Sequence, residues 1–257
     1  MTTRIAMWSG PRNISTALMR SWGNRTDTMV CDEPLYAHYL IATGHTDHPG
    51  FHETTRRHET DWRKAVAWLT GPMPAGVTVY YQKHMAHHLL PGMSIDWIDG
   101  LTNCFLIRAP HQMLSSLVEF LSSPSVEETG LPQQVRLFER LCARLGAAPP
   151  VIDAKDVLQN PVGMLQALCA RVGVTFDRAM LSWPAGPRDT DGAWAPYWYD
   201  KVYPTTTFAP YRPKASRLPQ ELIGVLRTCE KLYEQLYAHR IMPLQDRTTA
   251  SKSSGTS

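Results

Sequence analysis

A polar turn near the start of the chain, between an apolar run and a helical pattern, constrains the fold most. Residues 5–8 (IAMW) predict a buried strand, and residues 17–22 (ALMRSW) predict a helix. Backbone N–H groups at a helix start are unpaired and carry partial positive charge, so a polar turn there can bind an anion. In this turn, which we call the first loop (residues 9–16), the candidate anion-binding residues are Arg12, Asn13, Ser15 and Thr16.

The first loop differs from the loop that binds ATP or GTP in P-loop proteins. That loop reads G-x-x-x-x-G-K-[ST], and here the second glycine and the lysine are both missing. The segment alone also fits an ordinary junction of strand and helix, because Ser and Thr are good N-caps. Both interpretations stay open on this evidence.

Length and charge favour one globular domain. The chain has 257 residues, of which 26 are basic and 23 acidic, for a formal net charge of +3. This bias is too weak to indicate a nucleic-acid partner, although a local basic pocket could hold a small polyanion. We expect a single α/β domain over residues 1–245 and a disordered tail over residues 246–257, which are almost devoid of apolar side chains.

The cysteines and the apolar runs indicate in which cellular compartment the protein is expected. Five cysteines are scattered without C-x-x-C spacing and fall mostly in apolar runs, which is typical of reduced core residues. No signal peptide is recognisable, and no apolar run approaches the roughly 20 residues that span a bilayer. We therefore expect a cytoplasmic protein with no membrane partner.

Short apolar runs alternate with helical patterns along most of the chain. Further strands are predicted at residues 28–31, 77–81, 103–107 and 150–153. Helices are predicted at residues 35–42 and 61–69, from residue 111, from about residue 133, and at residues 161–172 and 219–239. Residues 43–60 predict a mobile loop that could act as a lid. This alternation indicates a three-layer α/β fold, a parallel β-sheet flanked by helices on both faces.

Polar side chains follow the predicted strands at the point where each one ends. They are Arg12, Glu33, Lys83, His84 and Arg108. Ligands of parallel sheets bind outside the carboxyl ends of the strands. We therefore expect these side chains to share one pocket.

Two further segments resemble a known family. Residues 105–116 (FLIRAPHQMLSS) look like the strand, Arg, helix and Ser segment with which sulfotransferases bind the 3′-phosphate of 3′-phosphoadenosine 5′-phosphosulfate (PAPS). Ser116 stands eight positions after Arg108, as in that family. Residues 151–174 resemble the family's later strand and helix, so that with the first loop the matches reach from residue 4 to residue 174. The resemblance implies the P-loop NTPase-like sulfotransferase fold, PAPS as the donor, and no metal.

The resemblance also implies roles for individual residues at the donor. Arg12 stands where most members have a lysine that contacts the 5′-phosphosulfate. Ile14 replaces the usual glycine, so the backbone there must either turn differently or approach the phosphate less closely. Arg108 and Ser116 would hold the 3′-phosphate. Further contacts implied near the C-terminal third are a basic loop with Arg212 and Lys214, and an aromatic ring on adenine from Trp194, Trp198 or Phe208.

Two candidates for the base come from two branches of the family. A His shortly after a Lys resembles the cytosolic branch and points to His84, or less closely to His87, whereas a Glu after the second strand resembles the tyrosyl-protein branch and points to Glu33. Lys83 and Arg12 would place charge beside the leaving oxygen. His84 and His88 have the spacing of paired metal ligands, but no third ligand lies nearby, so we expect no metal.

The resemblance implies a sulfotransferase that acts on a hydroxyl or amine of a small organic acceptor. A nucleotide-binding kinase or hydrolase and a catalytically silent nucleotide-binding member remain alternatives. The oligomeric state is not predicted. Aromatic residues that could line an acceptor pocket, although most fit the core better, are Tyr36, Tyr39, Trp62, Trp68, Tyr80 and Trp97.

Overall fold

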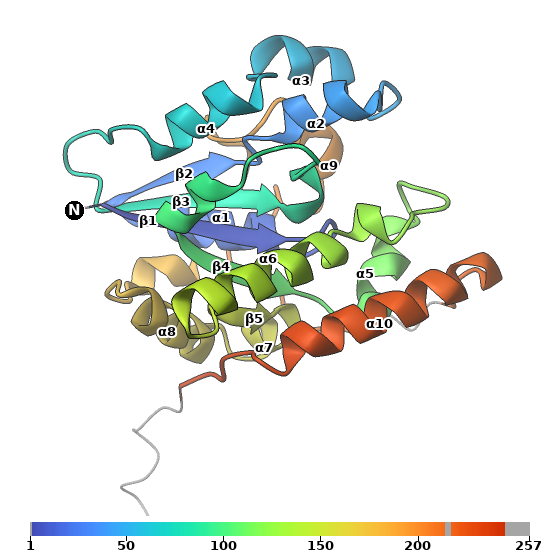
Figure 1. The fold of residues 1–257 in the computed structure, drawn as a ribbon. Coiled ribbons are helices and arrows are strands. Elements are labelled where there is room, and N and C mark those ends of the chain that lie inside the picture. The colour runs from blue at the N-terminus through green and yellow to red at the C-terminus, as the bar shows by residue number, and fades with distance from the viewer. Residues whose placement is uncertain (1, 214–216, 245–257) are drawn as a thin grey trace, which may run out of the picture.

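The computed structural model describes residues 2–213 and 217–244, so the predicted tail and Lys214 lie outside the described residues. Within these ranges a five-stranded parallel sheet has the order β2-β3-β1-β4-β5 (Figure 1). The strands are β1 (Thr3–Ser9), β2 (Thr28–Asp32), β3 (Val79–Met85), β4 (Thr102–Ile107) and β5 (Val151–Asp153). This arrangement confirms the predicted α/β fold class.

Helices cover both faces of the sheet, which makes three layers (Figure 1). One face packs against α1 (Ser15–Gly23), α7 (Ala154–Gln159) and α8 (Pro161–Val172). The other face packs against α5 (Pro110–Leu117), α6 (Leu131–Leu145) and α10 (Ile223–Tyr237). The remaining α-helices are α2 (Tyr36–Thr43), α3 (Phe51–Arg57), α4 (Trp62–Thr70) and α9 (Ala195–Trp198). Short 3-10 helices are η1 (Ala86–His88), η2 (Asp96–Gly100), η3 (Glu127–Thr129), η4 (Arg178–Leu181) and η5 (Gln220–Leu222).

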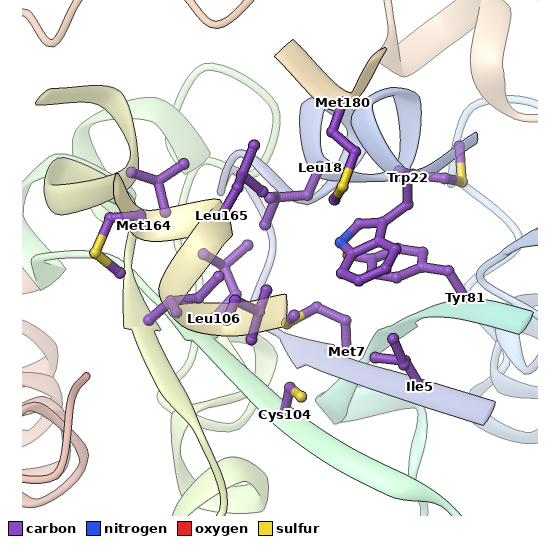
Figure 2. Packing of buried hydrophobic residues seen from close by; sticks show 14 of the residues in the cluster. Ile5, Met7, Leu18, Trp22, Tyr81, Cys104, Leu106, Met164, Leu165 and Met180 are labelled. Carbon is purple, nitrogen blue, oxygen red and sulfur yellow. The ribbon is translucent and has the colours of Figure 1, made fainter. Parts of the chain in front are cut away.

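The strands are buried on both faces because their side chains alternate between the two helix layers. In β1, Ile5 and Met7 pack toward α1 and α8, whereas Ala6 and Trp8 pack toward α5 and α6. Figure 2 shows the first of these layers, in which Trp22 of α1 stacks on Tyr81 of β3 with the ring centroids 5.4 Å apart. Apolar clusters on both faces therefore hold the sheet between its two helix layers.

Two segments differ from the prediction. Residues 43–60, expected as a mobile loop, contain helix α3. Strand β3 continues to Met85 instead of ending near residue 81, because it pairs in parallel with β1 as far as Ser9. Lys83 and His84 are therefore consecutive residues of a central strand, and they point to opposite faces of the sheet.

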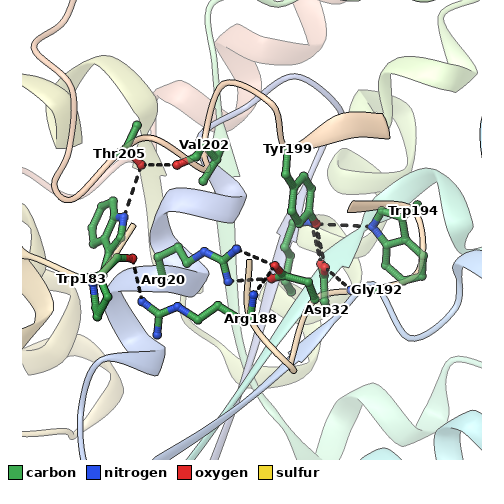
Figure 3. A network of polar contacts seen from close by, with 12 residues as sticks. Arg20, Asp32, Trp183, Arg188, Gly192, Trp194, Tyr199, Val202 and Thr205 are labelled. Atoms are coloured by element: carbon green, nitrogen blue, oxygen red, sulfur yellow. Dashed lines mark hydrogen bonds and ion pairs between the residues drawn. The ribbon is translucent and has the colours of Figure 1, made fainter. Parts of the chain in front are cut away.

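The segment from Trp183 to Phe208 has little regular structure, and buried polar contacts hold it against the sheet (Figure 3). Arg20 of α1 makes a two-pronged ion pair with Asp191, with N–O distances of 2.6 and 2.7 Å. Both side chains are almost fully buried. This segment thereby reaches the carboxyl ends of the strands, where it contributes walls to the cavity described next.

Candidate active site

A cavity of about 340 Å³ lies at the carboxyl ends of the first four strands. Its lining includes the candidate residues of the first loop and of the strand ends other than His84, together with Ser116, namely Arg12, Asn13, Ser15, Thr16, Glu33, Lys83, Arg108 and Ser116. They come from the first loop, from the ends of β2, β3 and β4, and from α5. The fold thus brings together side chains that are up to about a hundred positions apart in the chain, such as Arg12 and Ser116.

The first loop makes its turn at Arg12. Arg12 has a φ of 53°, whereas Ile14 has a φ of −90°. The left-handed conformation therefore falls on Arg12, two positions before Ile14, which stands where the family that this sequence resembles has its glycine. The Asn13 side chain holds the turn: its Nδ2 donates to the Leu106 carbonyl at 3.2 Å, and its Oδ1 accepts from the Ile14 N–H at 2.9 Å. Helix α1 begins at Ser15, which directs its first N–H groups toward the cavity.

Arg12, Arg108 and Ser116 form a contact between the first loop and α5. Arg12 Nε donates to Ser116 Oγ at 3.3 Å, and Arg108 donates to the Arg12 carbonyl. Burial lowers the pKa of both guanidinium groups, and the charge of Arg12 lowers the pKa of Arg108 further. Two cations so close together in a cavity wall favour a bound anion.

Lys83 lies at the centre of a buried polar group that we call the lysine cluster (Asp32, Glu33, Lys83 and Tyr199). Its Nζ donates to Asp32 Oδ1 at 2.8 Å, to the Tyr199 hydroxyl at 2.6 Å, and to Glu33 Oε1. The Tyr199 hydroxyl donates to Asp32 Oδ1 and Oδ2 at 2.8 and 2.7 Å (Figure 3). Gly192 N–H donates to Asp32 Oδ2 at 3.1 Å.

The electrostatics of the lysine cluster follow from its burial. Burial alone would lower the pKa of Lys83, but the carboxylates of Asp32 and Glu33 outweigh it and raise that pKa well above its usual value. Burial raises the pKa of Glu33, the positive charge of Lys83 opposes this, and the charge of Asp32 adds to it, with a net increase. The cluster therefore pairs a permanently charged ammonium with a carboxylate that can take up a proton.

Backbone strain also falls at the cavity. Within the described residues, the non-glycine residues with positive φ are Arg12 and Glu33, the latter at 40°. Each such conformation costs on the order of 1–3 kcal/mol and is common at functional sites. Both residues line the same cavity.

The sequence matches a family described as a sulfotransferase domain over residues 3–237. This chain belongs to that sulfotransferase family.

Sequence relatives carry a different name, and solved structures agree with the fold. The "Branched-chain-amino-acid aminotransferase-like protein 1" of Arabidopsis thaliana is 36% identical over 236 residues, which are 91% of this chain but 42% of that relative. A sulfotransferase domain from the curacin biosynthetic pathway superposes with a TM-score of 0.54 at 14% identity, covering 95% of this chain and 99% of the other. A sulfotransferase from Alicyclobacillus acidocaldarius superposes with a TM-score of 0.51 at 14% identity, covering 94% of this chain and 98% of the other. At this low identity the superpositions show the fold alone.

The structure places His84 of this sulfotransferase domain outside the cavity. Its ring stacks on Trp8 with the centroids 4.3 Å apart, on the opposite face of β3 from Lys83, and Nε2 lies 3.2 Å from Gln82 Oε1. Burial lowers the pKa of His84 to about 3. This placement does not fit His84, one of the two candidates for the base, to that role, because the strand continues and its side chains alternate. His87 and His88 do line the cavity, so His84 and His88 do not share a site.

The other predicted residues divide between cavity, core and surface. Trp194 and Trp198 line the cavity, as do Tyr36 and Tyr39. Phe208 instead packs edge-on against Trp183 in the core, 5.1 Å between centroids, so it does not fit a role on adenine. Arg212 is exposed and away from the cavity walls. Four other aromatic residues that were considered for an acceptor pocket also lie outside the cavity, namely Trp62, Trp68, Tyr80 and Trp97.

Sequence reasoning missed Asp32 and Tyr199. Asp32 carried a usable signal, because it directly precedes Glu33 at the end of a predicted strand. Its pairing in register with Lys83 is visible only in the structure. Tyr199 carried none, since it lies in an irregular segment 167 positions from the aspartate to which it donates.

Within the part of the chain that the structure describes, no helix has both the length and the apolar character needed to cross a membrane.

Acid should destabilise this domain through its buried histidines. An unfolded histidine has a pKa near 6.5, whereas that of His84 in the fold is about 3. Between these values the unfolded chain binds more protons, so stability falls as the pH falls below about 6.5. His84 alone should account for about 2 kcal/mol between pH 6.5 and pH 5. Urea unfolding at about pH 7.5 and about pH 5 measures the loss.

The matched variants are His84→Gln and His52→Gln, the latter at an exposed position. His84→Gln should lose less stability on acidification than the parent, and His52→Gln should lose as much as the parent. An equal loss in all three proteins would contradict the neutral burial of His84.

Proposed function

We propose that this domain transfers a sulfuryl group from PAPS to a hydroxyl or amine of a small organic acceptor. The observation that carries the proposal is the contact among Arg12, Arg108 and Ser116, beside the lysine cluster in one cavity. This contact supports a donor that carries two separate anionic groups, as PAPS does with its 5′-phosphosulfate and its 3′-phosphate. The five free cysteines in the described part of the chain fit a cytoplasmic location, which is part of the proposal.

The donor would lie across the first loop and α5. Arg12, Asn13, Ser15 and Thr16, with the N–H groups at the start of α1, would hold the 5′-phosphosulfate. Arg108 and Ser116 would hold the 3′-phosphate. Trp194 and Trp198 are the proposed partners of adenine, since both line the cavity. The contacts of Arg212 and Lys214 with the 3′-phosphate stay a prediction.

The reaction needs positioning, charge at the leaving oxygen and a base. In the proposed step, the acceptor oxygen or nitrogen bonds to sulfur while the bond from sulfur to the 5′-phosphate oxygen breaks, and its electron pair stays on 3′-phosphoadenosine 5′-phosphate (PAP). Arg12 and Lys83 stabilise the charge that develops on that oxygen. Glu33 takes the proton of the acceptor, and its raised pKa suits a base at near-neutral pH.

Substituting Arg108 should weaken nucleotide binding. Arg108→Ala removes a charge-assisted phosphate contact, which should cost about 1.5–3 kcal/mol, a loss of roughly ten- to over a hundredfold in PAP affinity. Calorimetric titration with PAP measures it. The control is Arg63→Ala, an exposed arginine away from the cavity, which should bind PAP like the parent. Unchanged PAP binding by Arg108→Ala would rule out its assignment to the 3′-phosphate.

Substituting Glu33 should remove transfer but spare PAP binding. Glu33→Gln keeps the shape and removes the proton acceptor, so turnover should fall about 10²- to 10⁴-fold. The assay is sulfuryl transfer from PAPS to a panel of phenols, alcohols and amines. In the parent, the rate should fall with decreasing pH from above the usual glutamate pKa, because Glu33 must be ionised and its pKa is raised.

Glu128→Gln serves as the control, because Glu128 lines the same cavity without touching the lysine cluster. The Glu128→Gln variant should show the same decrease in transfer rate at low pH as the parent. A Glu33→Gln variant with full turnover would exclude Glu33 as the base.

A further inference from the structure

The ammonium group of Lys83 has no spare hydrogen. A protonated lysine offers three N–H donors and no acceptor. Asp32, Glu33 and Tyr199 each accept one of them. Lys83 can therefore contact the donor, at the leaving oxygen or at a sulfuryl oxygen beside it, only if it releases one of these three partners.

Two of the three partners hold each other. The Tyr199 hydroxyl donates to both oxygens of Asp32, which also accepts from Gly192 N–H, and Trp194 Nε1 lies 3.4 Å from the same hydroxyl. The side chain of Asp32 is 1% exposed. Moving Lys83 away from Asp32 would leave a buried charge without its counter-ion, which is costly.

Glu33 is the partner that can be replaced. Its side chain is 12% exposed and lines the cavity. Within residues 2–213 and 217–244, Lys83 is the hydrogen-bond partner of its carboxylate, through Oε1. A carboxylate at the cavity wall can exchange its lysine contact for a hydrogen bond from the acceptor, and the ammonium then keeps Asp32 as its counter-ion.

We propose that Asp32 and Tyr199 are positioning residues that hold Lys83 so that its third N–H passes from Glu33 to a sulfuryl oxygen of the bound donor. Glu33 is thereby released to accept the proton of the acceptor. This inference rests on the proposed function. It makes the base available only after the donor has bound, so the acceptor is deprotonated in the complex with PAPS and not in the free protein.

The test compares PAPS with PAP, which has similar negative charge and lacks the sulfuryl group. Glutamate labelled with ¹³C at the carboxyl carbon reports the pKa of Glu33 by NMR, with Glu33→Gln identifying the signal. PAPS should raise the pKa of Glu33 by about one unit or more relative to the PAP complex, because the lysine has left. Equal titration of Glu33 in the two complexes would overturn the inference.

Tyr199→Phe tests the positioning role. Loss of the hydroxyl gives Lys83 a spare N–H, so it can contact the sulfuryl group while it keeps Glu33. The increase in the pKa of Glu33 that PAPS causes should therefore be smaller than in the parent. The rate of transfer should fall about tenfold or more, and the affinity for PAPS should stay within about threefold of the parent. The control is Tyr203→Phe, a neighbouring tyrosine that does not line the cavity, which should behave like the parent.

Asp32→Asn gives a second, independent variant. It removes the negative charge that contributes to the raised pKa of Glu33, so that pKa should fall in the free protein. Variants in which Glu33 titrates as in the parent would overturn the role of Asp32 and Tyr199.

If PAPS does not bind the parent in calorimetry, the proposed function fails with this inference. If PAPS binds and Glu33 does not respond to the sulfuryl group, only the inference fails.

Discussion

The buried ion pair of Lys83 and Asp32, between neighbouring strands β3 and β2, is the interaction on which the site depends. A lysine in the centre of a sheet is stable only with a counter-ion and satisfied hydrogen bonds. Register pairs Asp32 with Lys83 directly, and Oδ2 of the aspartate accepts from Tyr199 and Gly192. The same contact thus orients the lysine and fixes a distant segment as the wall of the cavity.

Much of the sheet and half of the site could be predicted because their signals are local. Apolar runs followed by polar residues marked the first four strands, although β3 continues to Met85, and parallel strands bring their carboxyl ends to one edge. Arg12, Glu33, Lys83 and Arg108 meet in the cavity for this reason. His84 does not, because the length of β3 depends on its pairing with β1, and one additional strand residue turns a side chain to the other face.

The remainder of the site depends on contacts between distant segments, which a single sequence does not reveal. Trp194 and Trp198 reach the cavity because Asp191 pairs with Arg20 and Tyr199 donates to Asp32. Phe208, an equally plausible aromatic residue in the sequence, packs against Trp183 instead. The choice among these aromatics is made by buried polar contacts and not by any local pattern.

The central claim is that the cavity is a PAPS site, and titration of the purified protein with PAP, ADP and Mg·ATP side by side tests it most directly. The 3′-phosphate distinguishes PAP from the other two nucleotides, and no acceptor is needed. Arg108 and Ser116 beside the first loop predict a clear preference for PAP without Mg²⁺. A preference for Mg·ATP, or no binding of any of the three, would contradict the account.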